Sequence, residues 1–513
     1  MSAALRNDDR RKTIADLARR LDSAAISGDP ATTVSGIQFD SRVVAKGDLF
    51  AALPGSDFDG HSFVARAIEA GAAALVVERS IDADVPQIVV SDSRAALALI
   101  AAEFYDHPSR DLTCIGITGT DGKTTTSSII DSILRRAGVS TGVIGTVGIR
   151  IGDARTLELP HQTTPESNLV QQYLREMVDA GVQVALIEAT SHGLAMHRLD
   201  TTRFTIAGVT NITREHLEYH GTIEAYRRAK ATLLERVGAE RGVVVLNADD
   251  PGAMSIKDFA AGAEVVTYGI ATRSVDLYAN DVVVRNDGST FTLNGDGVSA
   301  EVRIPLIGGF NIANALCAIG VARAAGVPVE TSIAAVATAT GVPGRMQPII
   351  SGQPYTVMVD YAHTPESIEK VLSLLRSGQD EGRLIIVTGS AGERDPGKRP
   401  LQGQACVRLA DISIFTNEDP RNEDPERILT DIAAGAIAAG GIDGETFFRI
   451  VDRREAIVTA FDLARPGDCV LLAGKGHEQS IIVGYEHRPW DEAEMARALL
   501  AERGFSDGRD AGG

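Results

Sequence analysis

Cysteine is scarce in this chain of 513 residues, and its four thiols, at Cys114, Cys317, Cys406 and Cys469, lie far apart. They form no C-x-x-C pair, so we expect reduced, mostly buried thiols in a cytoplasmic protein. Long hydrophobic runs are missing too, since no stretch approaches the roughly 18 apolar residues of a membrane span. The basic residues at 10–12 have acidic neighbours and no apolar core after them, which argues against a secretion signal.

Positive charge is also in short supply. The chain has 50 Lys and Arg against 69 Asp and Glu, a formal net charge of -19. A general nucleic-acid binder needs a basic face for the phosphates, so the charge excludes that class, although it does not bear on small anions. With 44% hydrophobic and 23% charged residues, the chain is neither disordered nor collagen-like. Its length predicts about three globular domains.

Short runs rich in Val and Ile alternate along the chain with longer amphipathic stretches rich in Ala and Leu. This pattern predicts buried parallel strands separated by helices, an α/β fold. The predicted strands include residues 74–77, 113–117, 184–187, 242–246, 384–387 and 468–472. Breaks in the pattern at residues 107–109 and 341–345 divide the chain into three predicted domains, 1–110, 111–342 and 343–513.

A glycine-rich loop follows the second of these strands. The strand at 113–117 runs into T-G-T-D-G-K-T-T at 118–125 and then into an amphipathic stretch at 127–134. Ile117 occupies the first glycine position of the general G-x-x-x-x-G-K-[ST] phosphate loop, so the spacing departs from that form. Strand, loop and helix nevertheless occur in the required order, which favours a nucleoside triphosphate site over a chance glycine-rich turn.

The residue types in this loop suit phosphate binding. Glycines let the backbone N–H groups face phosphate oxygens, and the start of the following helix adds a partial positive charge. Lys123 is placed to reach the outer phosphates, and the hydroxyl of Thr124 can bind Mg²⁺.

Further candidate residues follow in the same section. Glu188 ends a predicted strand, where ligands of open α/β sheets bind, and its carboxylate suits Mg²⁺. His216 and His220 are four residues apart, the spacing of two zinc ligands on a helix. The zinc-protease pattern needs Glu directly after the first His, however, and Leu217 stands there, so we disfavour zinc.

Several motifs together resemble the Mur ligases, which build the peptide of bacterial cell-wall precursors. The loop at 118–125 differs from the family form T-G-T-N-G-K-T-T only at Asp121. The segments E-A-T-S-H-G-L at 188–194, T-N-I-T-R-E-H-L-E-Y-H-G-T at 210–222 and G-G-F-N-I-A-N at 308–314 are also similar. Residues 226–231 are similar to the family segment that carries a carbamylated lysine.

This resemblance implies an ATP site, a magnesium site and a set of catalytic residues. The ATP-binding positions would be Gly119, Thr120, Asp121, Gly122, Lys123, Thr124, Thr125, Asn314, Arg345 and Asp360. The catalytic residues would be Lys123, Glu188, His216 and Lys230. Mg²⁺ would be held by Thr124, Glu188, His216 and the carbamate of Lys230, because an ammonium group cannot bind a cation but a carbamate can.

The outer sections would bind the other two substrates. Residues 39–50 resemble a uridine-nucleotide-binding segment, and the implied contacts to a UDP-N-acetylmuramoyl peptide are Ser41, Gln162, Thr163, Thr164, Thr190 and Arg198. Met196 stands where relatives commonly have Gln. Three late loops, at 392–398, 416–421 and 473–478, resemble an amino-acid pocket that would use Arg394, Glu418, Asp419, Pro420, Arg421, Gly474 and Glu478.

The identity of the incoming amino acid stays open at the sequence level. Family members that add meso-diaminopimelate have D-N-P-R where this chain has Glu418-Asp419-Pro420-Arg421. Arg421 can pair with a distal carboxylate, which favours diaminopimelate. Asp419 would repel that carboxylate and suit the distal amine of lysine or ornithine.

By resemblance, the predicted fold has a small N-terminal α/β domain for a nucleotide sugar, a central domain of P-loop ATPase type and a Rossmann-like C-terminal domain. The predicted function is an ATP-dependent ligase that adds a diamino acid to UDP-N-acetylmuramoyl-L-alanyl-D-glutamate through an acyl phosphate, with small-molecule substrates only. Two alternatives are a sister ligase of the Mur or folylpolyglutamate type and a binding module switched by nucleotide hydrolysis.

Overall fold

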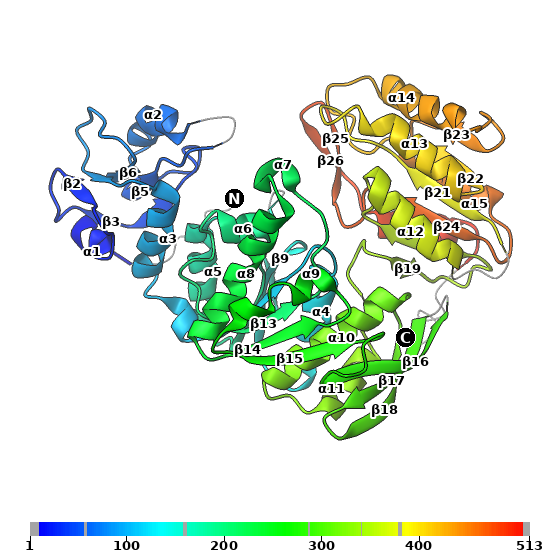
Figure 1. Cartoon of the computed structure of the whole chain (residues 1–513). Coiled ribbons are helices and arrows are strands. Elements are labelled where there is room, and N and C mark those ends of the chain that lie inside the picture. The colour runs from blue at the N-terminus through cyan, green and yellow to red at the C-terminus, as the bar shows by residue number, and fades with distance from the viewer. Residues whose placement is uncertain are drawn as a thin grey trace, which may run out of the picture. The chain divides into compact units, whose positions relative to one another are not determined.

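The computed structural model of the chain describes residues 10–55, 59–156, 162–285, 288–339, 341–377 and 382–505. The chain divides into two compact units (Figure 1). The first unit consists of Met1–Asn280, Thr292–Ala300 and Ala313–Val336, and the second of Asp281–Phe291, Glu301–Ile312 and Ala337–Gly513.

The N-terminal part of the first unit contains a five-stranded sheet in the order β2-β7-β6-β5-β4, parallel except for β2. Alternate side chains face opposite sides, as the two-residue period of a strand requires. Leu49 and Val76 pack in the core that α1 and α3 cover, whereas Phe50 and Leu75 pack in the core that contains α2. The elements are β1 (Lys12–Thr13), α1 (Ile14–Ala18), β2 (Ala25–Ser27), β3 (Thr33–Val34), β4 (Gly36–Gln38), β5 (Asp48–Ala51), α2 (Val64–Glu69), β6 (Ala74–Val77), β7 (Gln87–Val89) and α3 (Ser93–Phe104).

An eleven-stranded sheet follows, in the order β11-β10-β9-β12-β8-β13-β14-β15-β16-β17-β18. Strands β9, β12, β8, β13, β14, β15 and β16 are parallel, and β8 lies between β12 and β13. The elements are β8 (Thr113–Thr118), α4 (Lys123–Arg136), β9 (Thr141–Gly145), β10 (Gly148–Ile151), β11 (Ala154–Thr156), α5 (Ser167–Asp179), β12 (Val184–Glu188), α6 (Ser191–Ala195), β13 (Phe204–Val209), α7 (Leu217–His220), α8 (Ile223–Ala239), β14 (Val243–Asn247), α9 (Pro251–Met254), β15 (Glu264–Gly269), β16 (Leu277–Arg285), β17 (Gly288–Gly295), β18 (Val298–Ile304), α10 (Gly309–Ala324) and α11 (Val329–Val336).

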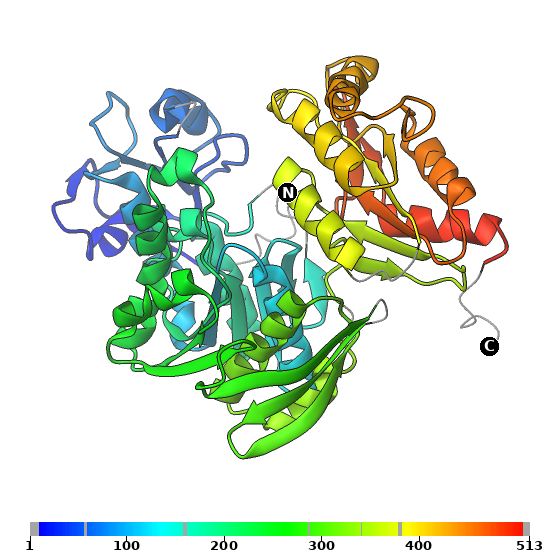
Figure 2. The same cartoon turned by 45° about the vertical axis from the view of Figure 1, so that its right-hand side comes forward.

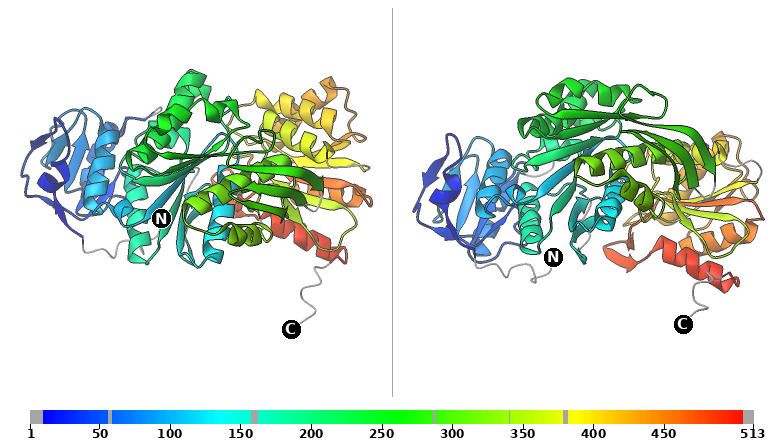
Figure 3. Two further views of the ribbon diagram at one scale, coloured as in Figure 1. Left: turned by 60° about the horizontal axis from the view of Figure 1, so that its bottom comes forward. Right: turned by 90° about the horizontal axis from the view of Figure 1, so that it is seen from below.

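Helices cover both faces of the parallel strands (Figure 3). On one face, side chains of α5, α6 and α8 form a continuous core with the sheet. Gly116 of β8 lies directly beneath Leu233 of α8, where an added Cβ would come within 2.7 Å of that side chain. On the other face, Gly208 of β13 lies beneath Cys317 and Val321 of α10. The helices cover the two faces of the sheet, and ligands of open α/β sheets bind at the carboxyl ends of the strands.

The second unit contains a six-stranded sheet in the order β19-β20-β24-β21-β22-β23, in which only β19 is antiparallel. Helices α12, α13 and α14 pack on one face and α15 and α16 on the other (Figure 2). The elements are β19 (Gln347–Ile349), β20 (Thr356–Asp360), α12 (Pro365–Ser377), β21 (Leu384–Thr388), α13 (Lys398–Leu409), β22 (Ile412–Phe415), α14 (Pro425–Ala438), β23 (Phe447–Arg449), α15 (Arg453–Leu463), β24 (Cys469–Ala473), β25 (Ser480–Val483), β26 (Glu486–Pro489) and α16 (Glu492–Glu502).

The structure confirms the predicted α/β class, and each of the six predicted strands is present to within one residue at either end. All four cysteines are buried and form no disulfide, as their spacing indicated. Among the described residues, no helix is sufficiently long and apolar to cross a bilayer.

Candidate active site

The glycine-rich loop joins the central strand β8 to α4, at the carboxyl edge of the sheet. Two of its glycines adopt positive φ, +151° at Gly119 and +86° at Gly122, and Lys123 is the first residue of α4. The position of Gly122 also requires glycine for lack of space, since a Cβ there would lie 2.4 Å from Oδ1 of Asn314. The loop therefore brings the start of a 14-residue helix and the predicted adenine-binding Asn314 together.

Two lysine side chains converge on one carbonyl of this loop. Nζ of Lys123 donates to the carbonyl oxygens of Gly119, at 3.0 Å, and Thr120, at 2.8 Å. Nζ of Lys230, from α8, donates to the same Gly119 oxygen at 2.7 Å. Lys230 is only 1% exposed, and burial, followed by the nearby charge of Lys123, holds its pKa well below the usual 10.5. A lowered pKa favours the neutral amine over the ammonium form.

Glu188 ends β12 beside the loop, and its buried carboxylate accepts hydrogen bonds from two threonines. Thr124 donates its hydroxyl to Oε2 at 2.8 Å, and Thr146 donates its hydroxyl to Oε2 at 2.9 Å and its N–H to Oε1 at 3.1 Å. No Lys or Arg of the described residues forms an ion pair with this carboxylate. Gly145 makes room for it, because a Cβ there would lie 2.2 Å from Oε1.

The contacts of Glu188 fit a magnesium site. The carboxylate and the Thr124 hydroxyl are oxygen ligands of the kind that Mg²⁺ prefers, and a buried carboxylate without a cation favours one. His216, the third predicted ligand, adopts a positive φ of 53° at the start of α7 and packs edge-on against His192, with ring centroids 4.6 Å apart. In the described parts of the chain, no three His, Cys, Asp or Glu side chains are grouped to hold a metal.

The predicted contacts for the muramoyl peptide lie partly together. Thr164 donates to the backbone oxygen of Glu188 at 2.7 Å and contacts the Thr190 hydroxyl at 2.9 Å. Arg198 donates to the Thr164 carbonyl at 2.9 Å, and Thr163 contacts the Thr146 hydroxyl at 3.0 Å. Gln162 is exposed nearby in sequence, while Ser41 is buried at 7% exposure in the N-terminal part.

A buried glutamate that the motifs did not indicate holds Arg198. Glu166 is 5% exposed and lies between two arginines. Nη2 of Arg198 lies 2.8 Å from one carboxylate oxygen, and Nη1 of Arg94, on α3, lies 3.2 Å from both. Sequence alone gives no indication of this contact because Arg94 is 72 residues from its partner.

The second unit contains the other predicted ATP contacts. The guanidinium of Arg345 stacks on the ring of Tyr361, 4.9 Å from its centroid. Asp360 ends β20 and accepts backbone N–H groups of Met346 and Ala362, each at 2.8 Å. Burial raises the pKa of the Asp360 carboxyl. Asp360 therefore lies at the carboxyl end of a parallel strand, as do the phosphate loop and Glu188 in the first unit, and Arg345 lies beside that end on Tyr361.

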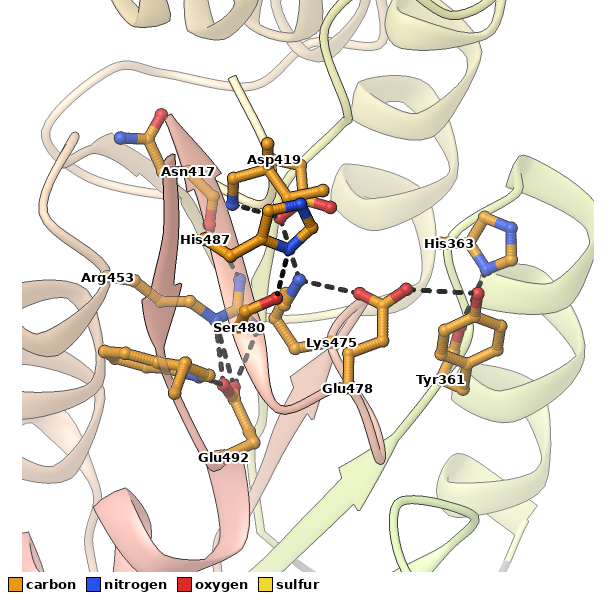
Figure 4. Close-up of polar contacts among 12 residues, drawn as sticks. Tyr361, His363, Asn417, Asp419, Arg453, Lys475, Glu478, Ser480, His487 and Glu492 are labelled. Carbon is orange, nitrogen blue, oxygen red and sulfur yellow. Dashed lines mark hydrogen bonds and ion pairs between the residues drawn. The ribbon is translucent and has the colours of Figure 1, made fainter. Parts of the chain in front are cut away.

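The three late loops also begin at strand ends in this unit, and Figure 4 shows part of the cluster that they form. Lys475, which the motifs did not assign, is fully buried and donates to Oδ1 of Asp419 at 2.9 Å and to Oε2 of Glu478 at 2.6 Å. Glu418 is buried with its Oε2 lacking a hydrogen-bond partner and 3.2 Å from where a Cβ of Gly474 would lie. Burial raises the pKa of the Glu418 carboxyl to about 7.

The predicted arginines of this pocket differ in exposure. Arg394 is exposed, whereas Arg421 is half-buried, with φ of +52° and a buried Nε that has no hydrogen-bond partner. Among the described residues, no carboxylate forms an ion pair with Arg421. Arg453 and Glu492 form a buried ion pair at 2.7 Å. Arg453 also donates to the carbonyls of Asn417 and Ala473, so it connects two of the loops that form the pocket.

The phosphate loop at the end of β8 is that of a nucleotide-binding enzyme, and comparison with known families shows an ATP-dependent ligase. The profile of the Mur ligase middle domain matches residues 117–322, the Mur ligase glutamate ligase domain matches residues 344–476, and the Mur ligase family catalytic domain matches residues 33–105. The chain belongs to the Mur ligase family.

Individual relatives match over nearly the whole length. A UDP-N-acetylmuramyl-tripeptide synthetase of Roseiflexus sp. (strain RS-1) is 47% identical over 487 residues, 92% of this chain and 95% of the relative. A UDP-N-acetylmuramoyl-L-alanyl-D-glutamate--2,6-diaminopimelate ligase of Geobacillus kaustophilus (strain HTA426) is 44% identical over 92% of this chain and 96% of its own. A solved structure of a ligase with the same name superposes with a TM-score of 0.68 at 32% identity, covering 96% of this chain and all of that one.

Proposed function

We propose that this chain joins diaminopimelate to UDP-N-acetylmuramoyl-L-alanyl-D-glutamate at the expense of ATP, in the synthesis of peptidoglycan precursors in the cytoplasm. The observation that carries the proposal is the convergence of Lys123, Lys230 and the buried Glu188 on the phosphate loop. The names of relatives that match over 92% of this chain support the substrates. The proposal keeps three domains, 1–110, 111–342 and 343–513.

In this proposal the phosphate loop binds ATP. Backbone N–H groups from Gly119 to Thr125 and the start of α4 hold the phosphates, while Asn314 contacts the adenine and Arg345 and Asp360 contact the nucleotide. Thr124, Glu188, His216 and carbamylated Lys230 would hold Mg²⁺, which neutralises charge on the phosphoryl oxygens. The buried, readily deprotonated amine of Lys230 supports a carbamate, since neutral amines add CO₂ and lose a proton.

The proposed reaction has two steps. A carboxylate oxygen of the glutamate attacks the γ-phosphorus, which releases ADP and gives an acyl phosphate. The neutral amine of the incoming amino acid then attacks the acyl carbon, forming the amide and releasing phosphate and a proton. Lys123 is placed to stabilise the charge of the transferred group, and the Thr164, Thr190 and Arg198 cluster is placed to orient the acceptor peptide.

Diaminopimelate suits the second-unit pocket better than lysine does. Arg421 has no carboxylate partner among the described residues, so it is available for a distal carboxylate. Arg394 would bind the other carboxylate, and Glu478 and Glu418 would accept from amino groups beside Gly474 and Pro420. Asp419, which the sequence analysis set against diaminopimelate, directs Oδ1 toward Lys475.

The test is a ligation assay with ATP, the UDP-sugar dipeptide and, in parallel, diaminopimelate, lysine and ornithine. We expect phosphate release that depends on both the dipeptide and an amino acid, with diaminopimelate preferred. Nucleotide hydrolysis without the other substrates would instead indicate a nucleotide-switched binding module. Ligation to a different acceptor would indicate a sister ligase.

A further inference from the structure

Lys475 is an ammonium group with no access to solvent. It lies in the loop after β24 and is held between two carboxylates, Asp419 at 2.9 Å and Glu478 at 2.6 Å (Figure 4). Its side chain is 0% exposed, and that of Asp419 is 9% exposed. A buried charge is stable only when it is paired. Lys475, Asp419 and Glu478 therefore form a triad of charges that stabilise one another, unlike an ion pair at the surface.

The carboxylate of Asp419 forms hydrogen bonds with groups of the protein. Its Oδ1 accepts from Lys475 and also from the backbone N–H of Ile482 on β25, at 2.9 Å. The loop is also fixed to the same residue of β25, because the N–H of Arg421 donates to the carbonyl of Ile482 at 3.0 Å. The backbone therefore holds Asp419 against Lys475, and the orientation of the Asp419 side chain does not depend on a ligand.

The side-chain charges of Asp419 and Arg421 are nevertheless close enough to interact. Two residues of chain span at most about 7 Å, which is within the range of unscreened interaction in a partly buried loop. A bare carboxylate at position 419 would oppose any ligand carboxylate that pairs with Arg421. With Lys475 in place, Asp419, Lys475 and Glu478 sum to one negative charge instead of two.

We infer that Lys475 determines the selectivity of this pocket, by neutralising Asp419 so that a distal carboxylate can bind at Arg421. The inference rests on the proposed function and extends it, since it assigns the choice between diaminopimelate and lysine to a residue that touches neither. Lys475 is a positioning and charge-balancing residue, and it also holds Glu478 in place for the amino group.

Two variants separate this role from simple packing. Lys475→Met removes the positive charge and leaves Asp419 and Glu478 as unpaired negatives. The double variant Asp419→Asn with Lys475→Met removes one charge of each sign, so the net charge of the triad returns to that of the natural chain. Lys370→Met, at an exposed position of α12, is the matched control.

The measurement is kcat/KM for diaminopimelate and for lysine, at saturating ATP and UDP-sugar dipeptide, with unfolding curves for each protein. We expect Lys475→Met to lower the diaminopimelate-to-lysine ratio by at least about tenfold, and the double variant to restore it. Lys370→Met should keep the natural preference. The KM for ATP should not change in any variant.

Each outcome bears on the inference. A folded Lys475→Met that keeps the natural ratio would overturn it, as would a double variant that fails to recover the preference. If Lys475→Met does not fold, the double variant alone decides, because only charge neutralisation predicts that it keeps the natural ratio. A natural chain that ligates neither amino acid would refute the proposed function itself, which distinguishes the two failures.

Discussion

Lys230, Glu188, Glu418 and Lys475 are ionisable side chains that the fold almost completely removes from water. Burying such groups costs free energy unless partners compensate. Their occurrence at strand ends therefore indicates functional sites at these positions in both units. The partners differ in kind. Lys475 contacts two carboxylates, whereas Lys230 contacts the backbone carbonyl of Gly119 and the ring face of Tyr226, 4.6 Å away.

The weak compensation of Lys230 leads to a prediction about its chemistry. Because burial lowers its pKa, we expect the amine to react with CO₂ at neutral to mildly alkaline pH. Protein equilibrated with ¹³C-bicarbonate should show one carbamate ¹³C resonance, which Lys230→Met removes together with at least about 99% of ligation. Lys370→Met should keep both. The same resonance in Lys230→Met would show that another amine carries the carbamate.

Glu418 leads to a prediction about pH and stability. Burial raises its pKa from the usual 4.5 to about 7, so between these values the unfolded chain has lost a proton that the folded chain keeps. Stability from this group therefore falls as pH rises, by about 3 kcal/mol in total. Urea unfolding should show that Glu418→Gln is more stable than the natural chain at pH 8 but not at pH 4.5. A pH-independent difference between the two proteins would contradict this.

At this scale the sequence predicted residues that belong to contiguous motifs and missed those that act through distant partners. Lys123, Thr124 and Glu188 could be assigned because a strand, a loop and a helix in order place them at a sheet edge. Lys475 and Glu166 could not, since Asp419 lies 56 residues from Lys475 and Arg94 lies 72 residues from Glu166, and only the folded backbone brings these pairs together. Local patterns contain no information on which carboxylate a buried cation meets.

Among the elements, the parallel strands were the most predictable. Strand β21 (Leu384–Thr388) and strand β6 (Ala74–Val77) are continuous apolar runs because both faces are covered by helices. The order of the strands was not predictable in this way. Placing β8 between β12 and β13 depends on side-chain packing across the sheet, such as Leu233 against Gly116, which no single run reveals.

The start of α4 offers an element-scale prediction in which two glycines serve as each other's control. Gly122 and Gly138 flank the helix at φ +86° and +79°, so Ala at either site costs about 1–2 kcal/mol of stability. Only at Gly122 does the added Cβ meet another group, Oδ1 of Asn314 at 2.4 Å, whereas Gly138 has nothing within 4 Å.

We therefore expect Gly122→Ala to lower ATP affinity by at least about tenfold, because it displaces Asn314 from the loop. Gly138→Ala should bind ATP normally. Calorimetric titration with MgATP, with thermal unfolding alongside, measures both effects. Equal loss of affinity in the two variants would mean that backbone strain at the helix ends, and not the Asn314 contact, controls binding.

For the whole chain, the net charge of -19 is compatible with anionic substrates, because a few cationic groups lie where the motifs place the phosphates and carboxylates. Lys123, Arg198 and Arg345 lie at or near strand ends, beside backbone N–H groups that add no formal charge. The family profiles cover the N-terminal, central and C-terminal parts in the same order as the motifs did.

Glu166 connects Arg94 and Arg198, which belong to different parts of the first unit, and these contacts lead to a prediction. Arg94 belongs to the N-terminal part, and Arg198 follows α6. Removing Arg94 leaves Glu166 with a single partner, so we expect Arg94→Ala to destabilise the first unit by about 2 kcal/mol. It should also raise the KM of the UDP-sugar dipeptide several-fold through Arg198, and leave the KM of ATP unchanged. Arg79→Ala, which breaks an exposed pair with Asp59, is the control and should change neither stability nor KM appreciably. If Arg94→Ala lowers stability without affecting the dipeptide, Glu166 joins the two parts of the unit but does not position Arg198.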